Sequence, residues 1–207
     1  MQVNNPLLLI ENTDTQDLHP RANHPPDQLR LLHGSISDIK CSKHPICTWI
    51  KHDNFDDPFC PALAAATEDI NPGKDPKETL PHIPASELPK CPKCKTGIQR
   101  PGIVWFNEGL NKNMLNDIEG WMDEGVIDMV LVIGTTSAVY PAAGYSELAR
   151  TEGHTSVVTV NLDAESESNL EDLYDEDFAF AGSAADLLPK LFEPVIGRPV
   201  AGEGRYF

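Results

Sequence analysis

The segment 36–100 restricts the possible fold of this chain more than any other stretch. It holds nine prolines and all five cysteines of the 207 residues, and its apolar residues follow no regular period. A segment so rich in proline cannot form regular helices, and a bound metal ion would supply the missing order. We therefore interpret it as a small module inserted into a larger α/β domain, which comprises residues 1–35 and 101–192. Residues 193–207 are expected to form a C-terminal tail.

Two pairs of cysteines stand near the two ends of this module. Cys91 and Cys94 form a CxxC knuckle followed by Gly97, which is typical of a zinc-ribbon turn. Cys41 and Cys47 are the partner pair, although their spacing is longer than usual. Four such ligands make a closed structural zinc site that leaves no open position for catalysis.

Alternatives to this ligand set remain at the level of sequence. His44 lies three residues after Cys41, so a set of three cysteines and one histidine also fits the spacing. The cysteines can also be reduced thiols without metal, whereas their odd number and the expected lack of a signal peptide argue against disulfides. Cys60 has no partner and is predicted to be a small buried apolar residue.

The composition excludes several classes of function. The net charge is −16, and no cluster of Lys and Arg is present, so we expect no direct nucleic-acid binding. The acidic balance favours basic partners, such as lysine-bearing peptides, or serves only solubility. No window approaches the roughly 18 apolar residues of a membrane span, and no basic region precedes the apolar run at 7–10. We therefore expect a soluble intracellular protein, with no preference among cytoplasm, nucleus and mitochondrion.

Regular structure is predicted on both sides of the module. The short apolar run 7–10 predicts a buried strand, and residues 28–33 re-enter the core after a polar loop. The later predicted strands are 103–106, 129–133, 157–162 and 178–181, and the predicted helices are 113–124, 142–152 and 184–192. Strands and helices alternate, which predicts a doubly wound parallel sheet of the Rossmann type.

Two of these stretches carry a more specific expectation. The run 129–133 is uninterrupted and apolar, which is typical of a parallel strand buried on both faces. The stretch 163–177 has eight acidic residues and no basic one, so we expect a solvated linker or an exposed edge.

Polar groups follow two predicted strands where α/β sheets bind ligands. Gly134, Thr135 and Ser137 lie in the loop after 129–133, where glycine admits a nucleotide and hydroxyls can bond ribose or phosphate. Asn161 lies at the end of the next strand, where an amide or an acid commonly holds ribose hydroxyls. The first loop by itself is a weak signal, and the position of Asn161 by itself favours an ordinary strand-ending turn.

Two further features have both a functional and a structural interpretation. His33 stands between an apolar pair and a small-residue turn, and its imidazole can act as a base near neutral pH. A lone histidine beside glycine is also often structural. The segment 103–106 can pair with an extended peptide, or it can be a core strand.

Taken in this order, these residues resemble the sirtuin family of NAD-dependent protein lysine deacylases. The resemblance covers about residues 30–192 and rests on Leu32-His33-Gly34-Ser35, the two cysteine pairs and the segments 101–108, 134–141 and Asn161. The stretch 53–63 and the Trp105-Phe106 pair look closest to class III sirtuins, which are known for removing acidic acyl groups.

The resemblance implies a role for each matching residue. His33 would be the general base that activates a ribose hydroxyl of NAD, while the acyl oxygen attacks the ribose carbon and nicotinamide leaves. Cys41, Cys47, Cys91 and Cys94 would hold structural zinc, with Thr48-Trp49 favouring Cys47 over His44. The NAD contacts would be Asn12, Asp14, Gly134, Thr135, Ser137, Asn161 and Ala184. The contacts to an acylated lysine-bearing protein or peptide would be Val104, Phe106, Asn107, Glu108 and Val139.

The chain departs from the family pattern at several positions. The family has a Gln-Asn-x-Asp motif before the base, where this chain has Glu11-Asn12-Thr13-Asp14, or residues 13–16 in another register. Asn107 replaces the usual glycine, and Asp163 stands where glutamate is common. No Gly-Ala-Gly-led strand–loop–helix unit precedes Leu7, so we expect an N-terminally truncated chain that lacks the first βαβ unit.

These observations leave a leading hypothesis and two rivals. The first is a sirtuin-type deacylase that moves the acyl group from lysine to ADP-ribose. We expect it to turn over poorly, because several charge-assisted contacts to NAD, each worth about 1.5–3 kcal/mol, would be lost. The second is a catalytically impaired sirtuin-like module that binds zinc and peptides. A dehydrogenase is disfavoured because no GxGxxG motif follows a strand.

Overall fold

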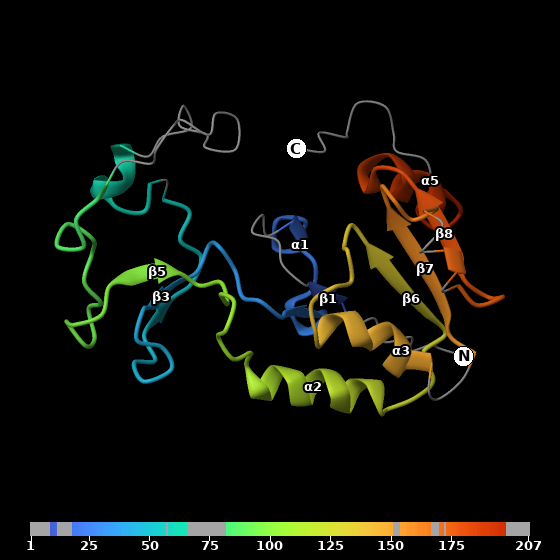
Figure 1. The fold of residues 1–207 in the computed structure, drawn as a ribbon, viewed down its shortest axis with the longest axis horizontal. Coiled ribbons are helices and arrows are strands. Elements are labelled where there is room, and N and C mark those ends of the chain that lie inside the picture. The colour runs from blue at the N-terminus through green and yellow to red at the C-terminus, as the bar shows by residue number, and fades with distance from the viewer. Residues whose placement is uncertain are drawn as a thin grey trace. The chain divides into compact units, whose positions relative to one another are not determined.

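The computed structural model describes residues 9–11, 18–56, 58–65, 82–150, 154–166, 170–171 and 173–197. The contacts within the chain divide it into two compact units, Met1–Leu115 and Asn116–Phe207. Each unit has its own sheets (Figure 1). The described residues include no helix that is long and apolar enough to cross a membrane.

The first unit opens with a small parallel sheet. Its elements, in chain order, are β1 (Leu9–Glu11), α1 (Leu18–Arg21), η1 (Pro26–Gln28) and β2 (Leu29–Leu31), where η marks a 3-10 helix. β1 and β2 pair in parallel. The strand predicted at 7–10 is therefore confirmed in its second half, while residues 7 and 8 lie outside the described residues.

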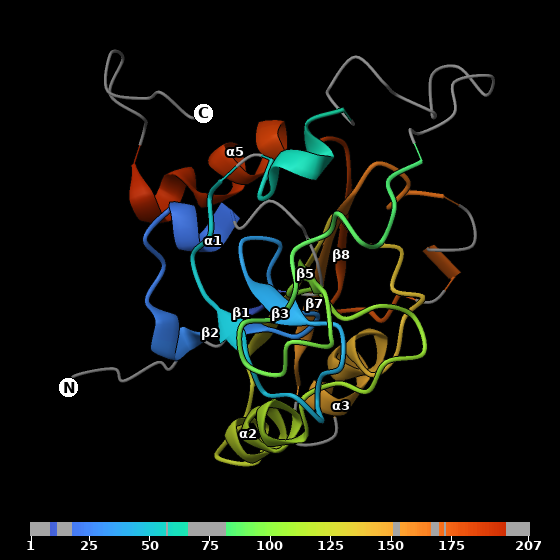
Figure 2. The same cartoon turned by 90° about the vertical axis from the view of Figure 1, so that its left-hand side faces the viewer.

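The second sheet of this unit is antiparallel. Its strands, in spatial order, are β4 (Ile50–Lys51), β3 (Ile39–Cys41) and β5 (Gln99–Pro101), and η2 (Pro61–Ala65) follows β4 in the chain. β3 and β5 lie side by side in Figures 1 and 2, although they are distant in the sequence. All three residues of β3 are buried. This sheet therefore brings the two ends of the segment 36–100 together.

The prediction of a strand at 103–106 is wrong. β5 ends at Pro101, and the chain then turns at Phe106 and Asn107. The N–H of Val104 donates to the carbonyl of His33 (2.7 Å) and not to a ladder of strand partners. The apolar residues at 103–106 resembled a strand because periodicity alone does not show where the backbone hydrogen bonds go.

The second unit contains a three-stranded parallel sheet in the order β6–β7–β8 (Figure 1). Its elements are β6 (Met129–Ile133), η3 (Ala142–Gly144), α3 (Tyr145–Arg150), β7 (Ser156–Asn161), β8 (Phe178–Ala181) and α5 (Ala184–Ile196). α2 (Lys112–Met122) crosses the boundary between the two units. The alternation of strands and helices predicted for this part of the chain is confirmed, and two strands have the predicted ends.

The central strand of this sheet carries its core. Val157, Val158 and Val160 of β7 are buried, because β7 has a neighbouring strand on each side. By contrast, β6 alternates exposed and half-buried residues, with Met129 and Leu131 among the exposed ones. The expectation that this strand is buried on both faces is therefore wrong. Its apolar run shows hydrophobicity but not which faces the other described elements cover.

The last helix also differs from the prediction. α5 continues to Ile196, past the predicted end at residue 192, although it contains Pro189 and Pro194. A proline inside a helix removes one hydrogen bond and predicts a break. Here the helix ends at Gly197, whose N–H donates to the carbonyl of Glu193 (2.9 Å). The division of the chain at residues 36, 101 and 193 stays a prediction.

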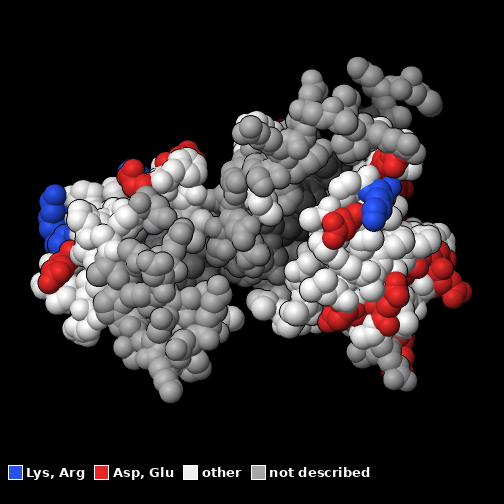
Figure 3. Space-filling view, turned by 90° about the horizontal axis from the view of Figure 1, so that it is seen from above, with Lys and Arg blue, Asp and Glu red and all other residues white. Residues whose placement is uncertain are grey.

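Acidic side chains are the more widespread charged groups on the surface face shown in Figure 3. One carboxylate of the acidic stretch 163–177 is nevertheless buried, which corrects the expectation of a wholly solvated linker. The side chain of Asp177 is 1% exposed and pairs with Arg150 at 2.6 Å. Its carboxylate also accepts the N–H groups of Val157 (2.9 Å) and Tyr174 (3.1 Å).

The ion pair shifts the pKa of Asp177. Burial by itself raises this pKa, but the hydrogen bonds from Arg150 and from the two N–H groups outweigh it and lower the pKa below its ordinary value. A lowered folded-state pKa stabilises the fold above the unfolded-state pKa of about 3.9, and this contribution is lost as the pH falls through the lower folded-state value.

Asp177→Asn is therefore expected to lower the free energy of unfolding by about 3 kcal/mol at neutral pH, because Arg150 loses its buried partner. The deficit should shrink as the pH falls below about 4, where the wild-type carboxylate also becomes protonated. Urea denaturation between about pH 3 and about pH 7 measures this. Asp175→Asn, at an exposed position of the same turn, is the control and should change stability little. A deficit that is equal at both ends of the range would contradict the linkage.

Candidate active site and metal centre

Four cysteine side chains meet beside the antiparallel sheet of the first unit. The sulfurs of Cys41, Cys47, Cys91 and Cys94 all lie within 4.8 Å of one another. The Sγ–Sγ distance is 3.7 Å for Cys41–Cys94 and for Cys47–Cys91. Cys41 ends β3 and the second pair lies in the turns before β5, so the pairing of these two strands brings the cysteines together.

These distances fit a tetrahedral metal ion. Zn–S bonds of about 2.3 Å at tetrahedral angles place neighbouring sulfurs about 3.8 Å apart, which is close to the observed separation. A disulfide would require about 2.05 Å. The cluster contains Cys47 and not His44, so the geometry fits the set of four cysteines and not the alternative with one histidine. The chemistry of this donor set is that of zinc.

The backbone around the cluster favours thiolates. The N–H of Gly97 donates to the sulfur of Cys94 (3.3 Å) and lowers the pKa of that thiol to about 5. Burial raises the pKa of the Cys41 thiol to about 12, so that thiol needs a cation to ionise. A Cβ at Gly97 would lie 2.5 Å from the sulfur of Cys41, which explains why glycine follows the knuckle. Cys60 is buried outside the cluster, as predicted.

His33 lies at the turn that follows β2. Leu32, the residue before it, is buried, and the N–H of Gly34 donates to the carbonyl of Leu31 (3.0 Å) to close the turn. The Nδ1 atom of His33 is buried and has no hydrogen-bond partner among the described residues. Burial lowers the pKa of this imidazole below 6.5. The ring is therefore neutral and able to accept a proton at neutral pH.

His33 and Gly34 lie against the segment that is predicted to bind substrate. A Cβ at Gly34 would lie 2.4 Å from the carbonyl oxygen of Gly102, so the two backbones approach each other closely. The hydrogen bond from Val104 to the carbonyl of His33 continues this contact. The structure thus brings His33 together with the start of the segment 103–108. Trp105 and Phe106 are exposed there.

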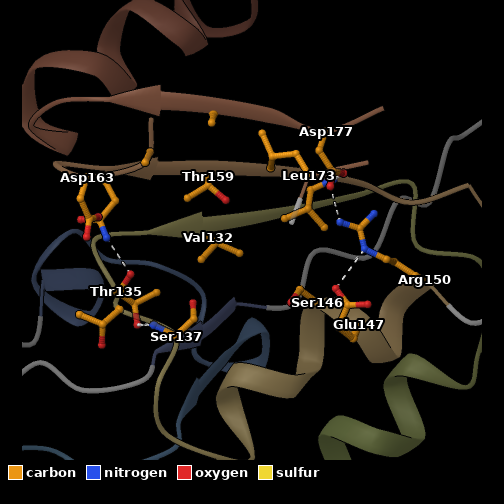
Figure 4. A pocket seen from close by; sticks show the side chains of 15 residues that line it. Val132, Thr135, Ser137, Ser146, Glu147, Arg150, Thr159, Asp163, Leu173 and Asp177 are labelled. Atoms are coloured by element: carbon orange, nitrogen blue, oxygen red, sulfur yellow. Dashed lines mark hydrogen bonds and ion pairs between the residues drawn. The ribbon is translucent and has the colours of Figure 1, made fainter. Parts of the chain in front are cut away.

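A hollow of about 210 Å³ lies along the parallel sheet of the second unit. Thr135, Ser137 and Asn161 are among its lining residues, and Figure 4 shows Thr135 and Ser137 at one end. The amide of Asn161 donates to the carbonyl of Thr135 (2.8 Å), and the N–H of Ser137 donates to the hydroxyl of Thr135 (3.1 Å). Gly134 leads into this loop from β6. The carboxyl ends of β6 and β7 are the positions where α/β sheets bind ligands.

The remaining predicted contacts of NAD and substrate in the second unit and near the N-terminus do not line the hollow or lie outside the described residues. Ala184 begins α5, and Val139 lies exposed in the loop before η3. Asn12 and Asp14 fall outside the described residues. Of the predicted NAD contacts, Thr135, Ser137 and Asn161 line the hollow. Val139 and Ala184 are not among its lining residues.

The sequence interpretation missed several charged residues of these sites. Arg150, Glu147 and Asp177 line the other end of the hollow, where Arg150 pairs with both acids (Figure 4). In the first unit, Lys40 and Arg100 are buried. No motif indicates either group, because the sequence does not show which charged residues become buried or which partners they meet.

Comparisons with known proteins agree on one family. The model of the Sir2 family matches residues 2–141. An NAD-dependent protein deacylase of Candida albicans is 33% identical over 215 residues, covering 92% of this chain and 67% of that protein. The mitochondrial NAD-dependent protein deacylase sirtuin-5 of Xenopus tropicalis is 32% identical over 151 residues, covering 70% of this chain and 43% of that protein.

A solved structure supports the fold. The crystal structure of a Sir2 homolog–NAD complex has a TM-score of 0.62 and 25% identity, and the match covers 90% of this chain and 57% of that one. The chain belongs to the Sir2 family of sirtuins, and its fold is the Sir2 fold, in which a parallel sheet with helices accompanies a small antiparallel sheet bearing four cysteines. It spans between about two fifths and two thirds of the length of these relatives.

Replacement of Cys91 by serine tests the metal centre. We expect the wild-type chain to hold about one zinc ion and the variant far less, because a structural site needs all four ligands. The first unit should then lose its fold, since binding of structural zinc supplies on the order of 10 kcal/mol. Elemental analysis and far-UV circular dichroism measure the two effects.

Cys60→Ser is the matched control, because it removes a buried cysteine outside the cluster. It should leave the zinc content unchanged. Equal loss of zinc in both variants, or a folded wild-type chain without metal, would contradict the assignment.

Proposed function

We propose that this chain carries the activity of an NAD-dependent protein lysine deacylase, which transfers the acyl group from lysine to ADP-ribose and releases nicotinamide. One observation carries the proposal most directly. His33, a neutral imidazole with a buried Nδ1 that has no partner among the described residues, is hydrogen-bonded through its backbone to the segment 103–108, in which Trp105 and Phe106 are exposed. Membership in the Sir2 family supports the same activity.

His33 is assigned the role of general base. In this role it accepts the proton of a ribose hydroxyl of NAD, and NAD supplies the ribose carbon that receives the acyl oxygen. The lowered pKa keeps the imidazole unprotonated, which a base requires. Among the described residues, no hydrogen bond occupies the Nδ1 atom of His33, so this nitrogen is available to accept a proton.

The segment 103–108 is proposed to bind the acylated lysine-bearing peptide. The main-chain N–H groups of Phe106 and Asn107 have no hydrogen-bond partner in the part of the chain that the structure describes. The side chain of Phe106 is 90% exposed. Free backbone donors beside exposed aromatic rings suit an extended peptide that adds backbone hydrogen bonds. Val104 and Val139 stay predicted contacts of the same substrate.

The hollow in the second unit is proposed to take the adenosine part of NAD. Thr135, Ser137 and Asn161 offer hydroxyl and amide groups there, and Gly134 and Ala184 stay predicted neighbours of the same ligand. The four cysteines are assigned to structural zinc, which takes no part in the transfer. We infer acylated proteins as partners, and the net charge of −16 favours substrates with basic residues near the acyl-lysine.

A peptide assay tests the activity. Acetyl-, succinyl- and malonyl-lysine peptides are incubated with the chain in the presence and absence of NAD, and acyl-ADP-ribose is detected by mass spectrometry. His33→Ala is expected to lower its formation by at least about 10²-fold, because general-base catalysis contributes roughly 10²–10⁴. His82→Ala, at an exposed position, should retain the wild-type rate.

Formation of acyl-ADP-ribose that survives His33→Ala would contradict the assigned base. No product in any assay, together with retained peptide binding, would favour the rival in which the chain is a zinc- and peptide-binding module.

The pH dependence of kcat/KM provides an independent test of the base. The rate should fall on the acidic side with an apparent pKa below 6.5, because burial lowers the pKa of His33 and the protonated ring cannot accept a proton. The rate should be constant between that pKa and about pH 8. A rise in rate as the pH falls would contradict an unprotonated base.

A further inference from the structure

A buried group of charges lies beside the segment 103–108. Arg100 in β5 is 5% exposed and Lys40 in β3 is 7% exposed. Buried cations are costly unless they are paired. Both pair with Glu108, Arg100 with its Oε1 and Lys40 with its Oε2 at 3.5 Å. One carboxylate thus pairs with two cations from neighbouring strands.

Arg100 and Glu108 also hold the backbone of the segment. Arg100 donates to the carbonyl of Ile103 (3.0 Å), and its guanidinium lies 4.1 Å from the centre of the Trp105 ring. The Oε2 of Glu108 accepts the N–H of Trp105 (3.1 Å), and the N–H of Glu108 donates to the carbonyl of Trp105 (3.0 Å). Residues 103–108, which we name the 103–108 turn, are therefore closed at both ends by these charges.

The carboxylate of Glu108 is committed to this arrangement. The hydrogen bond from Arg100 is the main cause that lowers the pKa of Glu108 to about 2, so the group stays ionised. Its two oxygens accept hydrogen bonds from Arg100 and Trp105, and one of them also forms the ion pair with Lys40. A group with these partners has little capacity to bind a peptide as well, whereas Phe106 and Asn107 at the tip of the turn keep backbone donors that have no partner among the described residues.

We propose that Glu108 is a positioning residue, which together with Arg100 and Lys40 keeps the 103–108 turn in the conformation that binds the acyl-lysine peptide, without contacting the peptide itself. This inference rests on the proposed function and narrows the predicted role of Glu108. It also connects the metal centre to the substrate, because Lys40 directly precedes Cys41 in β3 and Arg100 follows the second cysteine pair in β5.

Glu108→Gln is the first test, because glutamine keeps the shape and one acceptor but removes the charge. We expect the peptide KM, and the Kd of a fluorescein-labelled acetyl-lysine peptide measured by anisotropy, to rise about 10-fold. A small displacement of a binding segment has an effect of at least this size. The kcat at saturating peptide and the KM for NAD should change by less than about 2-fold, because the turn is not assigned to either.

A second set of variants examines whether the charges act as one unit. Arg100→Lys keeps the charge but loses the planar fork and its stacking on Trp105, so it should also raise the peptide Kd. The double variant Arg100→Lys/Glu108→Gln should have a peptide Kd no more than about 2-fold higher than that of the single variant with the higher Kd. The effects of substitutions within one network of contacts are not additive. If the increase in peptide Kd of the double variant equals the product of the two single increases, the proposal is overturned.

Asp56→Asn is the matched control. Asp56 is also a carboxylate paired with a lysine, Lys51 at 3.7 Å, but it is 73% exposed. It should change neither peptide binding nor turnover, because exposed pairs contribute little. An equal effect of Asp56→Asn and Glu108→Gln would show a general charge effect on the peptide and would overturn the positioning role.

Tryptophan fluorescence provides a readout that does not depend on activity. Glu108→Gln should increase the quenching of Trp105 by acrylamide, and this increase should disappear in a Trp105→Phe background. Unchanged quenching, or a fall in kcat with an unchanged peptide Kd, would overturn the proposal. If the wild-type chain forms no acyl-ADP-ribose and binds no acyl-lysine peptide, the proposed function fails; the quenching result then supports or overturns the bracing of the turn by itself.

Discussion

Four cysteine sulfurs packed within 4.8 Å of one another are the constraint on which the first unit depends. Four thiolates at this distance repel one another unless a cation neutralises them, and the described residues of the proline-rich segment 36–100 have little regular structure to oppose that repulsion. The cluster joins β3 to β5, and these strands carry Lys40 and Arg100 to Glu108. The metal centre is therefore connected to the 103–108 turn through two buried cations, and the backbone of this turn is hydrogen-bonded to His33.

The second unit depends on a different kind of interaction. Its parallel strands follow one another in the order of the chain, and the valines of β7 form its core. Arg150 connects α3 to the end of this sheet through the buried carboxylate of Asp177, which also binds the backbone of β7. These contacts leave a hollow at the strand ends that carry Thr135 and Asn161. The unit thus forms this hollow, which is the proposed NAD site, without contacts to the cysteine cluster among its lining residues.

One departure from the sirtuin pattern, Asn107, has a physical explanation in the structure. Asn107 stands where the family usually has glycine, and its φ of +69° lies in the left-handed region that glycine adopts most easily and asparagine tolerates better than other residues. The turn therefore keeps its geometry. Glu108 keeps the same turn closed from the other side through Arg100 and Trp105.

The sequence alone determined the ends of β6 and β8 and indicated the two cysteine pairs, whereas the geometry of the four sulfurs was needed to favour Cys47 over His44. Thiolate ligands restrict which residue types and spacings can hold zinc, and short apolar runs between polar turns define strands locally. Tertiary structure alone decided that the segment 103–106 is a turn, that β6 is half-exposed and that Asp177 is buried among acidic neighbours. It also decided that Arg100, Lys40 and Glu108 meet. These features depend on contacts between residues distant in the chain, and a charged residue carries no local mark that shows whether its partner will bury it.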